Sequence, residues 1–99
     1  MNKRVPEAGV KILGVYPSPA AREASFLFEV GSTERLEIEV YDVTGRCTAR
    51  PADKLYPAGS YTVSWNGLDS HGQKVASGVY FFRISGNRTA EIRKFALVR

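Results

Sequence analysis

The sequence contains few of the residues on which disulfide-rich domains, metal sites and small enzymes depend. Its one cysteine, Cys47, cannot form an intrachain disulfide or a CxxC site, and its one histidine is His71. The apolar runs, such as Val79–Phe82, are far shorter than the ~20 residues that a membrane-spanning helix requires. The first residues do not lead into the apolar core of a secretory signal. We therefore predict a linker or an expression remnant at residues 1–8 and one domain at residues 9–99.

Positive charge is concentrated in the second half of the chain. The net charge is +4, and residues 1–50 contribute nothing to it, because seven Lys/Arg balance seven Asp/Glu. Residues 51–99 carry seven basic and three acidic residues, and five of the basic ones lie in the last seventeen residues. They alternate with apolar residues, which is typical of a solvated sheet face or of an edge strand protected from aggregation. Nucleic-acid binding, which favours basic residues interleaved with exposed aromatic ones, is disfavoured.

Apolar and polar residues alternate with a period of two along most of the chain. Leu36, Ile38 and Val40 alternate with Glu37 and Glu39, so the apolar side chains face a core and the two glutamates are predicted to face solvent. No window of helical length carries an apolar stripe at helical spacing. The alternation predicts a core built from Phe26, Phe28, Leu36, Ile38, Val40, Tyr61, Val63, Trp65, Tyr80, Phe82 and Ile84.

Turn-forming residues separate seven segments of this kind. The first strand is predicted at Val10–Tyr16, and the last two at Gly78–Ser85 and about Arg88–Val98. A short strand is predicted near Cys47–Arg50, after a hairpin turn at Val43–Arg46. Seven short strands predict an all-β fold, an immunoglobulin-like (fibronectin III-like) antiparallel β-sandwich without the antibody disulfide. Apolar residues occupy both faces of the last strand, which is therefore predicted to be buried on both sides or bulged.

The polar residues that could carry chemistry are few and poorly spaced for it. Asp69, Ser70 and His71 are neighbours in one loop, so they cannot converge as a catalytic triad and are predicted to form a polar turn. Asn66 could join Asp69 and Ser70 around a calcium ion, but the spacing does not match an EF-type loop. Cys47 has no neighbouring histidine to activate its thiol. We therefore predict no enzymatic activity, no cofactor and no metal site.

Five segments resemble, in order, the motifs of one family of bacterial domains. They are Tyr16–Ala20 (YPSPA), Val40–Arg46 (VYDVTGR), Pro57–Gly72, Ala76–Arg83 (ASGVYFFR) and the basic closing segment Arg93–Arg99. In these motifs the chain resembles the C-terminal sorting domains of the type IX secretion system. The long central pattern is also shared with the Ig-like domain of the flagellar hook-capping protein FlgD. The resemblance covers about residues 12–99.

The resemblance implies a non-catalytic sorting domain of an exported protein, covalently linked to an upstream cargo domain. Its partner would be a secretion protein at the outer membrane, and its location the cell surface or the exterior after passage through the periplasm. Arg93, Lys94 and Arg99 are the candidate recognition residues, since exposed basic side chains can bind receptor carboxylates; alternatively, they only keep an edge strand soluble. The motif residues with an expected structural role are Pro17, Pro19, Asp42, Gly45, Gly59, Trp65, Gly78 and Tyr80.

The same motifs are compatible with a second function. Their glycines supply turn conformations, their prolines fix an extended segment, and their aromatic residues fill a core, so each motif has a purely structural explanation. A structural Ig-like assembly or spacer module, as in the hook cap, is therefore the alternative. An accessory binding domain of a secreted multidomain enzyme belongs to the same alternative.

Overall fold

The computed structural model describes residues 9–87 and 89–99, and the regular elements in this part of the chain are β-strands. The strands are β1 (Val10–Tyr16), β2 (Ala24–Val30), β3 (Glu34–Tyr41), β4 (Cys47–Tyr56), β5 (Gly59–Trp65), β6 (Gly78–Ser85) and β7 (Ala90–Leu97). The predicted linker at residues 1–8 lies outside the described residues. Within the described ranges, no helix is long and apolar enough to cross a membrane.

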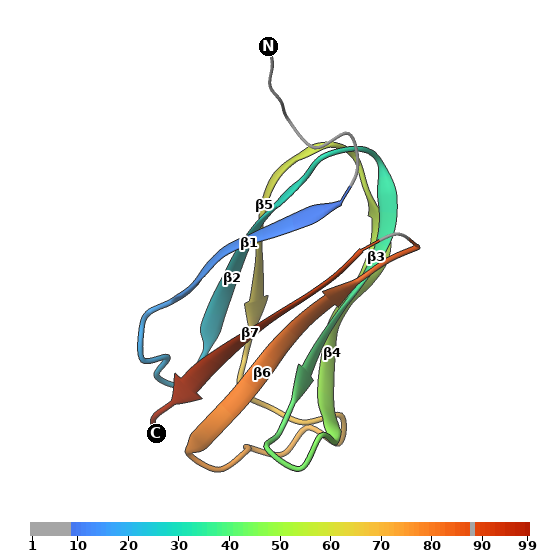
Figure 1. Ribbon diagram of the computed structural model, residues 1–99. Helices are drawn as coiled ribbons and strands as arrows, with labels where there is room; N and C mark the ends of the chain where they lie inside the picture. Colours follow the sequence, from blue (N-terminus) through green and yellow to red (C-terminus); the bar gives the residue numbers. More distant parts are fainter. Residues whose placement is uncertain (1–8, 88) are drawn as a thin grey trace.

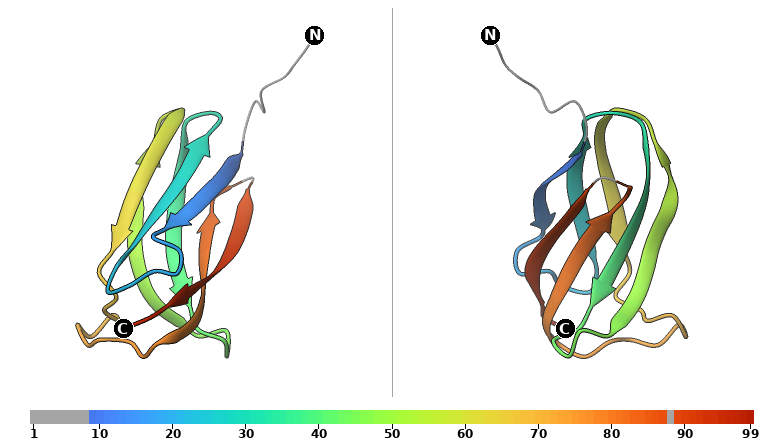
Figure 2. Two further views of the ribbon diagram at one scale, coloured as in Figure 1. Left: turned by 90° about the vertical axis from the view of Figure 1, so that its left-hand side faces the viewer. Right: turned by 45° about the vertical axis from the view of Figure 1, so that its right-hand side comes forward.

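The strands form two sheets that face each other (Figures 1 and 2). One sheet has the order β1-β2-β5 and the other the order β4-β3-β6-β7, and neighbouring strands in both are antiparallel. The prediction of an all-β antiparallel sandwich of seven strands is confirmed. The β3–β4 turn, the β5–β6 loop and the C-terminus all lie at the same end of the molecule (Figure 1).

Strand β4 is longer than the short strand predicted near Cys47–Arg50. Its pairing with β3 shifts register between Ile38 and Val40 and again between Val40 and Tyr41. At each shift β4 contains an extra residue, which makes a β-bulge and breaks the alternation of apolar and polar side chains. A strand is recognised from that alternation, so the part of β4 beyond the bulges could not be seen in the sequence.

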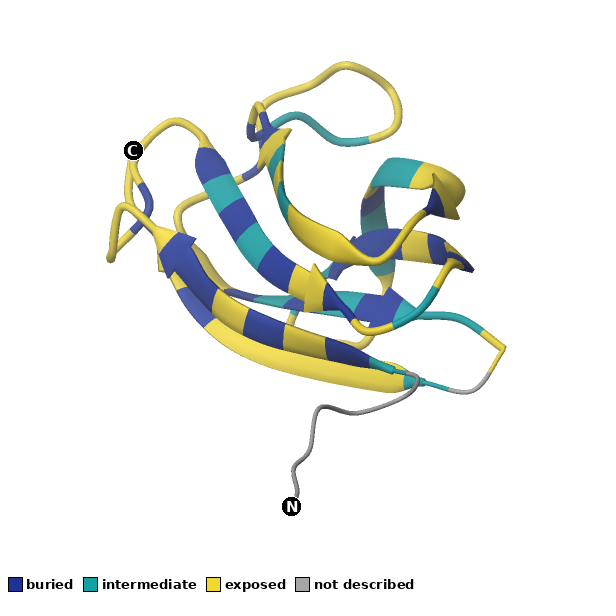
Figure 3. Ribbon diagram, turned by 90° about the horizontal axis from the view of Figure 1, so that it is seen from above, coloured by how far each residue is buried: buried dark blue, intermediate teal, exposed yellow. Residues whose placement is uncertain are grey.

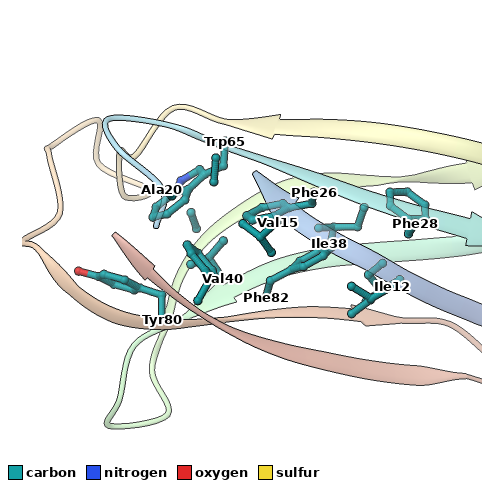
Figure 4. Packing of buried hydrophobic residues seen from close by; sticks show 14 of the residues in the cluster. Ile12, Val15, Ala20, Phe26, Phe28, Ile38, Val40, Trp65, Tyr80 and Phe82 are labelled. Atoms are coloured by element: carbon teal, nitrogen blue, oxygen red, sulfur yellow. The ribbon is translucent and has the colours of Figure 1, made fainter. Parts of the chain in front are cut away.

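The core lies between the two sheets and contains most of the residues that alternation predicts, together with others that the prediction omitted (Figure 4). Of the predicted set, only Tyr61 and Val63 are partly rather than fully buried, because they belong to β5, an edge strand. At the centre, the rings of Phe26 and Phe82 stack with their centroids 4.0 Å apart and join the two sheets. The buried residues that the prediction omitted are Val10, Ile12, Val15, Ala20, Ala24, Val30, Ala49, Tyr56, Val75, Phe95 and Leu97.

Strand β7 is buried on one face only, so the prediction that it is buried on both sides or bulged was wrong. Phe95 and Leu97 point into the core, whereas Ile92 and Val98 are exposed, and the pairing of β7 with β6 has no register shift. Figure 3 shows the alternation of buried and exposed residues as bands along the strands. Nothing among residues 9–87 and 89–99 covers the outward face of β7, and the apolar side chains of Ile92 and of Val98, just beyond the strand, are exposed.

We predict that Trp65→Ala lowers the free energy of unfolding by about 3–5 kcal/mol, because the change removes a large buried side chain and leaves a cavity. Trp65 is buried, packs edge-to-face against Tyr80 and Phe95, and donates a 2.9 Å hydrogen bond from Nε1 to the Leu68 carbonyl oxygen. Urea denaturation followed by circular dichroism measures the loss. Leu55→Ala, at an exposed position of β4, should cost less than about 0.5 kcal/mol. A similar cost for both variants would contradict the prediction.

Candidate functional site

The three candidate recognition residues do not form one surface. Arg93 and Lys94 are neighbours in β7, so their side chains leave opposite faces of the strand. Arg93 lies opposite Phe82, whose side chain points into the core, and Lys94 lies opposite Phe81 on the outer face. Arg99 lies beyond the end of β7. The basic edge predicted from the sequence is therefore divided among three environments.

Arg93 joins the two sheets at one side of the sandwich. Its Nη2 donates a 3.1 Å hydrogen bond to the carbonyl oxygen of Ile12 in β1, the outer strand of the other sheet. Ala20 closes the same side, because its backbone N–H donates to the Ala96 carbonyl at 2.9 Å and its carbonyl accepts from the Val98 N–H at 2.8 Å. Arg93 thus has a structural contact that a receptor would have to displace.

Arg99 holds the β5–β6 loop against the end of β7. Its backbone N–H donates to Ser77 Oγ at 2.9 Å, and its guanidinium donates to the carbonyl oxygens of Val75 and Gly67. Gly67 is buried with a φ of +76°, and a Cβ at this position would overlap the Arg22 carbonyl. The loop therefore requires glycine at this point, and Arg99 donates to two of its carbonyl oxygens.

Lys94 is the one of the three that is free to meet a partner. Its side chain is exposed on the outer face of the four-stranded sheet. Among the residues that the structure describes, no hydrogen bond or ion pair holds its ammonium. A lysine in this setting can bind a carboxylate without the loss of any intramolecular contact.

The motif residue Asp42 organises the β3–β4 turn. Its Oδ1 accepts hydrogen bonds from the backbone N–H groups of Thr44 at 2.9 Å and Arg46 at 3.1 Å, and from Thr44 Oγ1 at 2.6 Å. The hydrogen bond from the Thr44 hydroxyl is the main cause that lowers the pKa of the Asp42 carboxyl. Gly45 adopts a φ of +86°, which glycine tolerates without strain. Both residues lie in the β3–β4 turn, where Asp42 accepts the hydrogen bonds that close it.

The remaining motif residues lie in strands or in the segments that join them. Tyr80 is buried and donates a 2.6 Å hydrogen bond from its hydroxyl to the Ala76 carbonyl, and burial raises the pKa of this hydroxyl. Gly59 and Gly78 are the first residues of β5 and β6. Pro17 and Pro19 are exposed in the segment between β1 and β2, just before Ala20.

The Asp69–His71 segment forms a turn, as the sequence predicts. Asp69 Oδ1 accepts hydrogen bonds from the backbone N–H groups of His71 and Gln73, both at 2.9 Å, and the bond from Gln73 is the main cause that lowers the pKa of the Asp69 carboxyl. Asn66 Oδ1 similarly accepts from the Leu68 N–H at 3.0 Å. Over residues 9–87 and 89–99, no group of three or more His, Cys, Asp or Glu side chains could hold a metal ion.

The prediction that Glu39 faces solvent was wrong. Glu39 lies on the outer face of β3, yet its side chain is only 6% exposed, because three side chains close over it. Tyr41 Oη donates to Glu39 Oε1 at 2.8 Å, and Arg50 donates to Oε2 from Nε at 3.0 Å and from Nη2 at 2.9 Å. Arg83 Nη1 lies 3.6 Å from Oε1. We call these four residues the Glu39 cluster.

The β4 bulge brings Arg50 to Glu39. Ile38 pairs with Ala52 and Val40 with Ala49, so both Arg50 and Pro51 lie opposite Glu39. The sequence gives no signal for this pairing, because it depends on the register of two strands. Glu37, two residues earlier on the same face of β3, is exposed, as predicted for both glutamates.

The cluster keeps the Glu39 carboxylate charged. Burial acts to raise the pKa of this carboxyl, but hydrogen bonds from Tyr41 and Arg50, with the charges of Arg50 and Arg83, outweigh burial and lower the pKa. Cys47 Sγ lies 4.0 Å from Glu39 Oε2, and burial together with that carboxylate raises the pKa of the Cys47 thiol. A raised pKa makes the thiol less reactive at neutral pH.

We predict that Glu39→Gln lowers stability at neutral pH by about 1–2 kcal/mol, a modest value because Arg50 and Arg83 are 58% and 39% exposed and solvent screens their charges. A lowered pKa in the folded state means that the stabilisation is present above the ordinary pKa of 4.5 and is lost as the pH falls below it. The variant should therefore lose less stability than the wild type on acidification. Glu37→Gln is the matched control, and an identical pH dependence for both variants would refute the role of the cluster.

We predict that Arg99→Ser loosens the β5–β6 loop and leaves the core intact. The Val75 N–H, which donates to the Gly67 carbonyl at 3.1 Å, should exchange with deuterium about tenfold faster or more, because the guanidinium that fixes both carbonyls is gone. Hydrogen-exchange NMR measures this rate. Amides of Phe82 and its neighbours should keep their rates, and Lys94→Ser should change neither set. Unchanged exchange at Val75 would show that Arg99 does not hold the loop.

Comparison with solved structures finds a similar fold within two larger proteins. The chain matches the dimeric latent PorU from Porphyromonas gingivalis with a TM-score of 0.78 at 21% identity, over 99% of this chain and 10% of that one. It matches PorZ, described as an essential bacterial surface component of the type IX secretion system of that organism, with a TM-score of 0.62 at 23% identity, over 89% of this chain and 11% of that one. The chain thus spans about a tenth of the length of each.

Comparison of the sequence with protein-family models identifies the family of the chain. A search of curated proteins finds no match. The family model of the FlgD Ig-like domain matches residues 18–90, which include β2 to β6 and the turns between them. This match covers most of the chain, from the segment before β2 to the start of β7. The chain therefore belongs to the FlgD Ig-like domain family.

Proposed function

We propose that this domain is a non-catalytic sorting domain of an exported bacterial protein, recognised by secretion machinery at the outer membrane. The observation that carries the proposal is that nearly the whole chain matches, in fold, a part of PorU, and that PorZ, a type IX secretion component, has a similar part. The family-like motifs from Tyr16 to Arg99 point to the same system. The domain would be linked to an upstream cargo domain and located at the cell surface or outside the cell.

Recognition in this proposal depends on charge at the outer face of β7. Lys94 is exposed and lies beside Phe81, so its ammonium can reach a receptor carboxylate without disturbing the fold. Arg93 and Arg99, the other two candidates, are held by the carbonyls of Ile12, Val75 and Gly67. Substitution of Arg93 or Arg99 would therefore affect the fold as well as recognition. Substitution of Lys94 tests recognition alone.

We predict that a reporter fused upstream of the whole chain reaches the surface of a type IX-competent host, and that Lys94→Ser reduces this delivery several-fold. The reason is the loss of one solvent-exposed charge contact, which is worth up to about 1 kcal/mol. Surface protease accessibility and cell fractionation measure delivery. Lys11→Ser is the matched control, because Lys11 is an exposed lysine of β1 in the other sheet.

Different outcomes of this experiment would contradict either the choice of recognition residue or the sorting function itself. Normal delivery of the Lys94→Ser fusion would remove Lys94 as a recognition residue. If Arg93→Ser or Arg99→Ser blocks delivery while the purified variant melts like the wild type, recognition lies at that residue. No delivery of the intact fusion would overturn the sorting function.

A structural assembly or spacer module is the second candidate, and the family match favours it. The matched family is named for the Ig-like domain of FlgD, and the match needs no feature of the closing strand. An accessory binding domain of a secreted multidomain enzyme is the related form of this candidate. Either form would show intact binding or assembly of the parent protein and no export of a fused reporter.

A further inference from the structure

The outer face of the four-stranded sheet carries apolar side chains that nothing in the described part of the chain covers. Tyr41 of β3 pairs with Phe81 of β6, and Ile92 of β7 pairs with Arg83. Ile92 is 61% exposed, and Val43, in the adjoining turn, is 69% exposed. Together these residues line a shallow groove of about 390 Å³. We call it the outer-face groove.

The other sheet also exposes two large apolar side chains, Leu13 (41%) and Tyr16 (53%), both on its edge strand β1. On β2 and β5 the outward side chains are mainly short and polar: Ser25 pairs with Ser64, Leu27 with Thr62, and Glu29 with both Lys11 and Ser60. An antiparallel sheet with one solvated face is expected to look like this one. Contiguous exposed apolar residues rimmed by polar ones instead mark an interaction site. Tyr41, Val43, Phe81 and Ile92 form such a contiguous set around the outer-face groove.

The rim of the groove has a positive excess. Arg50 and Arg83 share one carboxylate, that of Glu39, and Lys94 lies opposite Phe81 with no carboxylate on it. The Asp42 carboxylate also borders the groove, but its Oδ1 is occupied by the turn. Arg83 contacts Glu39 only at 3.6 Å and is 39% exposed, so most of its five N–H donors remain available. Arg83 and Asp42 are the charged residues that line the groove itself, and Lys94, opposite Phe81, gives this surface an excess of one positive charge.

We infer that the outer-face groove binds an acidic segment of another polypeptide, with an aromatic or aliphatic side chain as its anchor. The anchor would lie between Phe81, Ile92 and Val43, and neighbouring carboxylates of the segment would bind Arg83 and Lys94. The volume suits one or two side chains, which is the scale of an anchored segment. This surface would serve a sorting domain and an assembly module equally, so the inference stands apart from the proposed function.

The test uses the whole chain, labelled with ¹⁵N, and a short synthetic peptide in which glutamate alternates with phenylalanine and leucine. The peptide should shift the amide signals of Tyr41, Phe81 and Ile92 and their neighbours. Ile92→Ser should weaken binding about tenfold, since an apolar contact is lost. Lys94→Ser should weaken binding about threefold and reduce its salt dependence, since one charge contact is lost.

Matched controls lie outside the groove. Leu55 is 59% exposed on β4 of the same sheet, so Leu55→Ser removes an equally exposed apolar side chain and should leave binding unchanged. Lys11→Ser removes an exposed lysine of the other sheet and should also have no effect. Circular dichroism and melting curves must show that all four variants fold.

Each contrary outcome overturns the inference. These outcomes are no binding, signal shifts away from the groove, equal effects of Ile92→Ser and Leu55→Ser, and equal binding of a peptide with lysine in place of glutamate. Sedimentation velocity that detects a dimer lost in Ile92→Ser would assign the groove to a second copy of the chain. Binding of anionic phosphatidylglycerol vesicles through the same residues, without peptide binding, would assign it to a lipid surface.

Discussion

The stacking of Phe26 on Phe82 across the sandwich is the contact on which the rest of the fold depends. The two rings come from β2 and β6, the middle of one sheet and the inside of the other, and neither is exposed to solvent. Phe95 of β7 packs edge-to-face against Phe26, so the same ring also fixes the strand that carries the basic residues. The inward register of β7 follows from this contact, and that register divides Arg93 from Lys94.

Alternation of residue types predicted most of the strands and the centre of the core, because one buried face imposes a period of two, but it missed most of β4 and many residues at the edge of the core. It could also have separated Arg93 from Lys94, since adjacent residues of a strand point to opposite faces. It could not predict the Glu39 cluster. Glu39 is on the solvent side of β3 by pattern, and only the β4 bulge, a property of the register between two strands, brings Arg50 over it. Nor could it predict the contacts of Arg99, which join residues far apart in sequence.

The two outer faces of the sandwich carry different side chains, and packing of the core does not explain the difference. Packing of the core alone would allow mainly polar residues on both outer faces, as on β2 and β5, although β1 exposes Leu13 and Tyr16. The four-stranded sheet instead keeps Phe81 and Ile92 at its surface. An apolar residue exposed to water gains little for folding and adds a risk of aggregation. Its presence there is therefore better explained by contact with another molecule than by the fold.

The Glu39 cluster and the groove are linked through Arg83 and Tyr41, which belong to both. The buried carboxylate accepts a hydrogen bond from the Tyr41 hydroxyl and attracts Arg83, whose Nη1 lies 3.6 Å away, so it restrains two groove residues before any partner binds. Side chains fixed in advance lose less conformational entropy on binding, which favours affinity without additional contact area. Burial of the Glu39 carboxylate on an otherwise solvated face is therefore consistent with a role in orienting Tyr41 and Arg83 at the groove.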